Sequence, residues 1–303
     1  MDFADTLLSR INGETETKRN NSALICFSSL ETGKTLSRMA TYITRSKSEK
    51  SSVTFLYLIS GTGEGEMLPG EKMDEYQHRI ISGFIPADEK DKITLRLFVR
   101  PVEESRASIT KIVEDQKVNL ILAGAGSSEF DPESIKTYSR LRSDPTNSDA
   151  FIFEQFEERE AGVLKNIHSL FSRNTLSAGL FIDKGATEFR KVFIPLLHKT
   201  DLHLFTCIHR IAQQENMRIM LWDAIGLIPS DPKIQKLYQF IAKKAEGRIS
   251  LWNTNRKITS DFIREQALTV ISTEGWDKLI RTPLPWTECL PSTLIIKEKT
   301  NSM

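Results

Sequence analysis

Small and hydroxyl-bearing residues follow two apolar segments of the chain, where they could bind a phosphate. Glycines let backbone N–H groups approach an anion closely, and serine hydroxyls add further donors. The candidate residues are Ser28, Gly124, Gly126, Ser127 and Ser128. In open parallel sheets, ligands bind outside the carboxyl ends of the strands, which is where these residues would lie. The alternative is a plain tight turn without a ligand.

The sequence shows no comparable group of candidate catalytic residues. Hydrolysis needs a serine, cysteine or carboxylate pair at a strand end with a base in reach, and the sequence shows no such set. His168 lies in a predicted amphipathic helix over 157–171 without a neighbouring nucleophile. We therefore expect a binding module that is not an enzyme, although the fold class alone does not exclude catalysis on a small molecule.

A group of possible metal ligands lies in the second half of the chain. It consists of His198, His203, Cys207 and His209. His203 and Cys207 are four residues apart, so they share one helix face. The predicted helix over 202–214 must also bury Leu204, Ile208 and Ile211, and Cys207 can join that apolar stripe. We expect no metal site.

Composition limits the class of protein. The 303 residues allow two domains, and the net charge of +1 gives no general attraction for nucleic acid. The longest apolar stretches are far shorter than the roughly 20 residues of a spanning helix, and the N-terminus lacks a secretory signal. Three widely spaced cysteines indicate reduced thiols. These features predict a soluble, cytoplasmic protein that does not insert into a membrane.

Short apolar segments alternate with helical ones, which is typical of an α/β fold with parallel strands. Strands are expected over 23–27, 53–59, 94–99, 118–123 and 178–182 in the first half, and over 191–197, 217–222, 248–252, 268–271 and 293–297 in the second. Helices are expected over 35–45, 70–82, 102–116, 157–171, 202–214, 231–245 and 260–266. Asp231 followed by Pro232 predicts a helix start, and Gly247 a helix end.

The repeated order indicates a diverged internal duplication. It predicts an N-terminal arm or linker over 1–21 and two domains over 22–185 and 186–303, each a five-stranded, mainly parallel sheet with helices on both faces.

The segment 94–128, with its strand, proline turn, helix and glycine-ended strand, resembles universal stress protein domains. The resemblance implies two such domains in tandem. Nucleotide-binding members have two glycines separated by two residues and an aspartate after the first strand. Here Gly124 and Gly126 are one residue closer, and Ser28 stands in place of the aspartate. A free-standing stress protein that binds an adenine nucleotide, with ATP, AMP or a cyclic dinucleotide as candidate ligands, is the alternative function.

A second resemblance covers 177–222 and the closing segment 286–297. Ile182-Asp183-Lys184-Gly185, the strand over 191–197 and the turn His198-Lys199-Thr200-Asp201 are similar to the cytosolic C-terminal region of bacterial monovalent cation:proton (Na+/H+) antiporters. This resemblance implies a regulatory domain at the inner face of the cell membrane, joined through 3–18 to a membrane-embedded antiporter domain and acting as a homodimer.

Overall fold

The structure is a computed structural model, and it describes most of the chain. The described residues are 3–11, 21–44, 51–59, 72–84, 93–125, 176–186, 188–214, 216–253 and 256–297. Within these ranges no helix is both long and apolar enough to span a membrane. The predicted helix over 157–171 lies outside the described residues.

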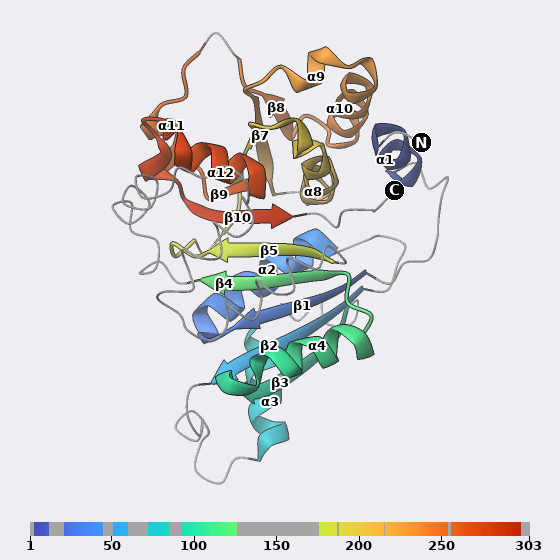
Figure 1. Cartoon of the computed structure of the whole chain (residues 1–303), viewed down its shortest axis with the longest axis vertical. Helices are drawn as coiled ribbons and strands as arrows, with labels where there is room; N and C mark the ends of the chain where they lie inside the picture. The colour runs from blue at the N-terminus through green and yellow to red at the C-terminus, as the bar shows by residue number, and fades with distance from the viewer. Residues whose placement is uncertain are drawn as a thin grey trace. The chain divides into compact units, whose positions relative to one another are not determined.

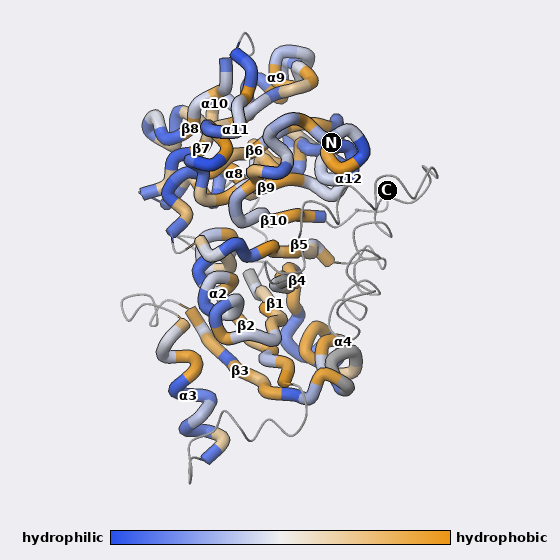
Figure 2. Tube along the Cα trace, turned by 90° about the vertical axis from the view of Figure 1, so that its left-hand side faces the viewer, coloured by the Kyte–Doolittle hydropathy of each residue, from blue (hydrophilic) through white to orange (hydrophobic). Residues whose placement is uncertain are grey.

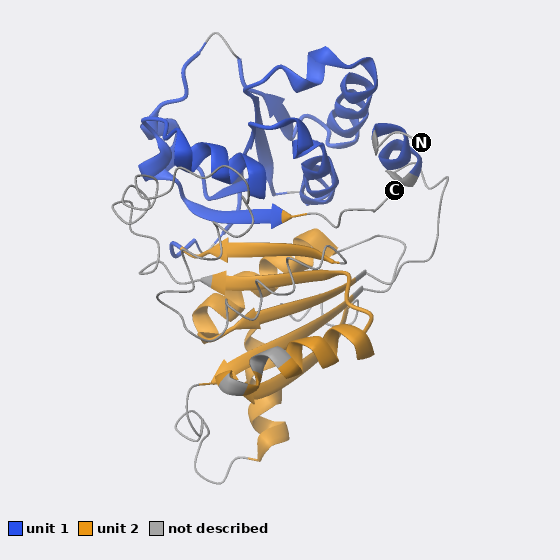
Figure 3. Cartoon of the chain, in the orientation of Figure 1, with its two compact units in different colours: residues 1–19, 131–148, 184–296 blue, residues 20–130, 149–183, 297–303 orange. Residues whose placement is uncertain are grey.

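The chain divides into two compact units, which Figure 3 shows in different colours. The N-terminal unit comprises residues 20–130, 149–183 and 297–303, and the C-terminal unit comprises 1–19, 131–148 and 184–296. The predicted domain boundaries at 22, 185 and 186 stay a prediction, as does the assignment of each half to the universal stress protein type.

Five parallel strands form the sheet of the N-terminal unit. They are β1 (Asn21–Phe27), β2 (Ser51–Ile59), β3 (Ile93–Pro101), β4 (Leu120–Ala125) and β5 (Ser177–Ile182). Their spatial order is β3-β2-β1-β4-β5, and the described pairings are parallel. The apolar residues of β1 are fully buried, as expected of a strand covered on both faces. In Figure 2 hydrophobic residues dominate β3 and β5.

Helices cover both faces of this sheet. They are α2 (Leu30–Thr44), α3 (Met73–Phe84) and α4 (Ser105–Asp115), the last after a 3₁₀ turn, η3 (Val102–Glu104). α2 and α3 lie on one side of the strands and α4 on the other (Figures 1 and 2). Beneath α2 and α3, the ring of Phe27 stacks on Tyr57 at 5.2 Å and meets Phe84 edge-on at 5.4 Å. These aromatic side chains form the centre of the core.

The C-terminal unit has the same design. Its strands are β6 (Lys191–Leu196), β7 (Arg218–Asp223), β8 (Ile249–Leu251), β9 (Leu268–Ser272) and β10 (Ser292–Lys297), in the order β10-β9-β6-β7-β8. The described pairings are again parallel. Numbered from its own first strand, each unit therefore has the strand order 3-2-1-4-5. The predicted parallel α/β fold is confirmed.

Among its described residues, this unit has eight helical segments. They are α1 (Phe3–Ile11), η5 (Lys199–His203), α8 (Leu204–Ala212), α9 (Leu227–Ser230), α10 (Pro232–Lys244), α11 (Ser260–Arg264), α12 (Thr273–Arg281) and η6 (Thr287–Cys289). α10 begins where predicted, since the Asp231 carboxylate accepts a hydrogen bond from Lys233 N at 2.8 Å. It ends before Gly247, whose φ of 79° is in the left-handed region.

Aromatic side chains fill the core of the C-terminal unit. The Phe193 ring lies 5.7 Å from Phe262, 5.8 Å from Trp286 and 6.4 Å from Trp222. Trp276 and Trp286 are each only 2% exposed. Trp222, Trp276 and Trp286 therefore contribute to the packing of this core.

The structure differs from the predicted helices in three places. α2 begins at Leu30 and not at 35, directly after the exposed Ser28 and Ser29. No helix was predicted after β9, but the Ser272 hydroxyl caps a nine-residue helix, α12, there. The arm over 1–21 contains a helix, α1, which packs against α10 (Figure 1).

Candidate functional site

The N-terminal unit brings the predicted phosphate-binding residues to one edge of its sheet. β1 lies between β2 and β4, and the strand order reverses between β1 and β4. Cys26 pairs with Ala123, so Ser28 and Gly124 both lie at the carboxyl end of this strand pair. Ligands of open α/β sheets bind at such a switch point. Gly126, Ser127 and Ser128 lie outside the described residues, and the nucleotide site stays a prediction.

Gly124 has a packing role at this edge. A Cβ atom added to Gly124 would lie 2.2 Å from Thr32 Cγ2 and 2.8 Å from Leu36 Cδ1, both on α2. A Cβ on Gly33 of α2 would lie 2.7 Å from the ring of Phe27. The two glycines therefore let α2 lie close against β1 and β4, which explains Gly124 without a phosphate.

The first turn of α2 has one feature that favours anion binding and one that opposes it. Ser28 and Ser29 are exposed, and the Gly33 amide donates the first helical hydrogen bond to Ser29 O at 2.9 Å. Exposed amides at a helix start attract anions. However, Glu31 lies in the same turn, and its carboxylate pairs with Lys34 at 3.4 Å. That negative charge opposes a phosphate at this helix end.

The C-terminal unit has a buried carboxylate, Asp201, at the corresponding switch point between β6 and β9. Asp201 is fully buried. One of its oxygens accepts hydrogen bonds from Leu197 N at 2.6 Å and His198 N at 2.8 Å, and the other accepts a short hydrogen bond from the Ser272 hydroxyl. Asp201 thus joins the end of β6, the turn η5 and the end of β9.

Ser272 continues this network into α12. Its Oγ donates to Asp201 and accepts from Gly275 N at 2.8 Å, which caps the first turn of the helix. Further along α12, Lys278 Nζ donates to Leu197 O at 3.0 Å. The carboxyl ends of β6 and β9 are therefore joined to each other and to α12 by internal hydrogen bonds. We name Asp201, Ser272 and the two amides that Asp201 binds the Asp201 hub.

Burial raises the pKa of Asp201, while the hydrogen bonds from Ser272, His198 and Leu197 and the nearby His203 act in the opposite direction. Burial prevails because the charged carboxylate loses more hydration free energy than the hydrogen bonds from these donors restore. Asp201 has no exposed surface with which to reach a ligand. In the structure it acts as a hydrogen-bond acceptor for two backbone amides and the Ser272 hydroxyl.

Asp201 was expected only as part of the turn His198-Lys199-Thr200-Asp201, and Ser272 had no expected role. The signals were present, because His198 and Asp201 have the spacing of a capping box and form one around η5. Ser272 precedes a helix with Glu274 in its first turn, which is a typical N-terminal pattern. What the sequence could not show was that the two caps meet across the ends of β6 and β9.

The turn after β5, part of the segment that resembles antiporter regions, connects to the closing strand. Lys184 N donates to the Ser292 hydroxyl at 2.9 Å, and Lys184 Nζ donates to Leu290 O at 2.8 Å. Burial lowers the pKa of Lys184, and the nearby Cys289 acts against this shift. Gly185 follows with a φ of 81°, so the glycine of this motif is required by the turn.

The histidine group is not assembled as a metal site in the part of the chain that the structure describes, where no three potential ligands converge. His198 Nδ1 contacts the Thr200 hydroxyl at 2.8 Å, and His203 Nδ1 contacts Thr200 O at 2.8 Å. Cys207 is buried on α8. These residues belong to the packing and capping of η5 and α8.

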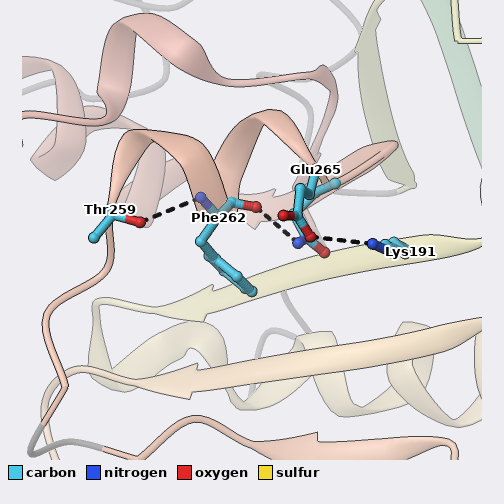
Figure 4. Close-up of polar contacts among 5 residues, drawn as sticks. Lys191, Thr259, Phe262 and Glu265 are labelled. Atoms are coloured by element: carbon cyan, nitrogen blue, oxygen red, sulfur yellow. Dashed lines mark hydrogen bonds and ion pairs between the residues drawn. The ribbon is translucent and has the colours of Figure 1, made fainter.

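The opposite, amino end of β6 is fixed by α11. Figure 4 shows Thr259 capping this helix through the amide of Phe262 at 3.2 Å, and Glu265 pairing with Lys191 at 3.2 Å. The Lys191 carbonyl also accepts from Ala267 N at 2.9 Å. The exposed ion pair contributes little, on the order of 0–1 kcal/mol, so the backbone hydrogen bond and Phe262 packing hold this end.

Comparison with known proteins gives a likeness in fold. No protein-family model matches the chain, and no curated protein shows significant sequence similarity. Among solved structures, the chain is similar to the cytoplasmic domain of a prokaryotic cation chloride cotransporter, with a TM-score of 0.50 and 9% identity. The match covers 93% of this chain and 96% of that one. At this identity the likeness shows a shared fold.

A UDP-GlcNAc 2-epimerase from Neisseria meningitidis bound to UDP-GlcNAc also matches, with a TM-score of 0.25, 10% identity, and coverage of 82% of this chain and 77% of the other. That likeness is too small to carry an argument about this protein.

Proposed function

We propose that this chain is a regulatory domain of a cation transporter and works on the cytoplasmic side of a membrane. The observation that carries the proposal is the extent of the structural likeness, which takes in nearly the full length of both chains. A likeness limited to one parallel α/β unit would be weak evidence, because many unrelated proteins share such units. Here both units are matched together.

The specific class we propose is a monovalent cation:proton antiporter. The segment Ile182-Asp183-Lys184-Gly185 and the strand β6 support it, since they resemble the cytosolic regions of that group. The hydrogen bonds of Lys184 to the start of β10 give this segment a structural role that any relative of the same fold would need. The proposal includes that this chain forms a homodimer, as the resemblance to antiporter regions implies.

We propose further that the domain is not a catalyst. In the C-terminal unit, the Asp201 hub occupies the switch point. In the N-terminal unit, side chains of α2 pack directly against Gly124. Incubation of the purified protein with nucleoside triphosphates should release no phosphate above the buffer rate. Turnover that follows the protein through purification and is lost in a Ser28→Glu variant would contradict this.

The experiment that tests the transporter role is fractionation of cells in which the native gene carries a C-terminal tag. The tagged product should sediment with membranes, either within a longer polypeptide or together with a copurifying transporter. The 303-residue chain alone has a mass of 34.5 kDa. A tagged product of that mass, wholly in the supernatant and without a membrane protein bound to it, would contradict the proposal.

A second candidate, binding of an adenine nucleotide, is favoured by the exposed Ser28 and Ser29 at the switch point before α2. Calorimetry with ATP, AMP and cyclic dinucleotides tests it. Saturable binding that Ser28→Glu abolishes would support a ligand at this edge, because the added carboxylate repels phosphate. Binding that is unchanged in this variant would place the ligand elsewhere.

A further inference from the structure

The outermost strand of the N-terminal unit, β3, has a long edge without a neighbouring strand. All nine of its residues pair with β2 on one side. Among the strands that the structure describes, β2 is its only neighbour (Figure 1). At about 3.3 Å per residue, the other side of β3 is an edge about 30 Å long. A long, apolar edge strand is a template for pairing with another strand.

The two faces of β3 differ in exposure. Alternate residues of a strand share a face. On one face Leu97 is buried and Leu95 is half-buried. On the other face Thr94 and Arg96 are exposed and Phe98 is half-buried. A strand added beside β3 would therefore cover apolar surface on both faces and would meet the charge of an arginine on one of them.

An internal contact touches this edge near its end. Arg100 Nη1 donates to Val99 O at 2.9 Å, and the Arg100 guanidinium lies 5.9 Å from the centroid of the Phe98 ring. The contact does not involve residues 93–97. A partner strand would replace it at Val99 O with a backbone hydrogen bond, so the contact does not prevent pairing.

The outer strand of the C-terminal unit is a poorer template. β8 has only three residues, against nine in β3. Short edge strands are one of the means by which proteins avoid pairing with other chains. The 42% exposure of Leu251 on β8 therefore does not by itself indicate a partner strand there.

We infer that β3 pairs antiparallel with β3 of a second copy of this chain and joins the sheets of two N-terminal units across a twofold axis. The inference rests on the homodimer of the proposed function, to which it assigns a surface. An axis at Leu97, the middle residue of β3, pairs all nine residues. Opposite residues must lie on the same face, so the neighbouring registers place the axis at Arg96 or at Phe98.

The charges of β3 favour the register centred on Leu97. There Arg96 lies opposite Phe98 of the second copy, where a cation–π contact is favourable, and Arg100 lies opposite Thr94. An axis at Arg96 would place the two copies of Arg96 opposite each other. An axis at Phe98 would place Arg96 opposite Arg100. Like charges directly opposite each other destabilise a strand pair. The register that pairs the whole strand is therefore also free of this repulsion.

Sedimentation equilibrium tests the pairing. At about 0.1 mM the wild-type chain should have twice its monomer mass of 34.5 kDa, and it should dissociate on dilution because one strand pair is a small interface. Phe98→Arg should weaken dimerisation about tenfold or more, since it places an arginine opposite Arg96 at two symmetric positions. Adding Arg96→Glu to Phe98→Arg should restore the dimer, because opposite charges then face each other at both positions.

The matched control is Leu251→Arg, which makes the same kind of change on the other outer strand, β8. It should dimerise as the wild type does. Equal loss in Phe98→Arg and Leu251→Arg would overturn the inference, as would a dimer that Phe98→Arg leaves unchanged or a double variant that does not recover. Thermal melting checks that each variant folds.

A distance measurement tests the register without altering the charges. A spin label on Thr94→Cys, with the half-exposed Cys289 replaced by serine, should lie about 20 Å from its symmetry mate, since six residues separate them along the paired strands. Absence of this distance at about 0.1 mM would overturn the pairing. A dimer held by another surface would leave the proposed homodimer in place. A monomeric wild type would contradict both, while membrane fractionation tests the transporter role separately.

Discussion

At the scale of single residues, Asp201 connects several elements of the C-terminal unit. Its carboxylate accepts from two backbone amides and from Ser272, which in turn caps α12. A single buried side chain therefore holds the ends of two strands and the start of a helix in place. Removing it would leave all three donors without an acceptor.

Asp201→Ala should lower the free energy of unfolding by about 3–5 kcal/mol, since it leaves a cavity and unpaired buried donors. Asp201→Asn should cost less, about 1–2 kcal/mol, because its amide oxygen still accepts and its NH₂ group can donate to Ser272. Urea denaturation measures both. Equal, small losses in the two variants would show that the Asp201 hub is not a stabilising network.

The pH dependence of these variants has a definite sign. The pKa of Asp201 is raised in the folded chain, so its contribution to stability is present at low pH and lost as the pH rises through the folded pKa. Asparagine does not ionise. The stability difference between wild type and Asp201→Asn should therefore be larger at pH about 3 than at pH about 7, and a difference of the opposite sign would contradict the raised pKa.

His209 gives a second pH-dependent prediction. Burial, with Lys244 and Arg210 nearby, lowers the pKa of His209 to about 4. Below the unfolded pKa the unfolded chain binds a proton that the folded chain does not, so stability falls as the pH drops from about 6.5 to about 4. His209→Gln should flatten this part of the stability curve. His78→Gln, at an exposed position on α3, is the control that should not.

At the scale of elements, the close approach of α2 to the sheet depends on Gly124. Gly124→Ala should destabilise the chain by about 2 kcal/mol or more, because the new Cβ overlaps Thr32 and Leu36. The matched control is Gly83→Ala in α3, where a Cβ meets no atom within 4 Å. That change should stabilise by about 0.5–1 kcal/mol. Thermal melting of both variants distinguishes them, and a neutral Gly124→Ala would contradict the packing role.

The elements were largely predictable from the sequence, since buried parallel strands such as β1 and β6 are nearly continuous apolar runs. α12 was missed because Gly275 and Trp276 suggest a turn when the Ser272 cap is not weighed. The start of α2 was placed too late because Gly33 weakens the helical pattern, although its packing on Phe27 requires glycine. The Asp201 hub was not predictable, because it depends on the contact between η5 and β9.

At the scale of the whole molecule, the chain combines two units with one strand order, the Asp201 hub at the switch point of the C-terminal unit and a long outer strand, β3, in the N-terminal unit. Under the proposed role, this chain passes on a signal and does not turn over a substrate. Such a domain would act through differential contacts in two states of the transporter.

Cation flux tests the transporter role most directly. It would be measured in vesicles from cells that carry the native gene product, with this chain intact or disrupted by Asp201→Ala, at equal amounts of transporter in the membrane. We expect disruption to change how flux depends on the ion concentration at the cytoplasmic side, while the membrane domain still transports. Flux curves that coincide over the whole concentration range would contradict a regulatory role for this chain.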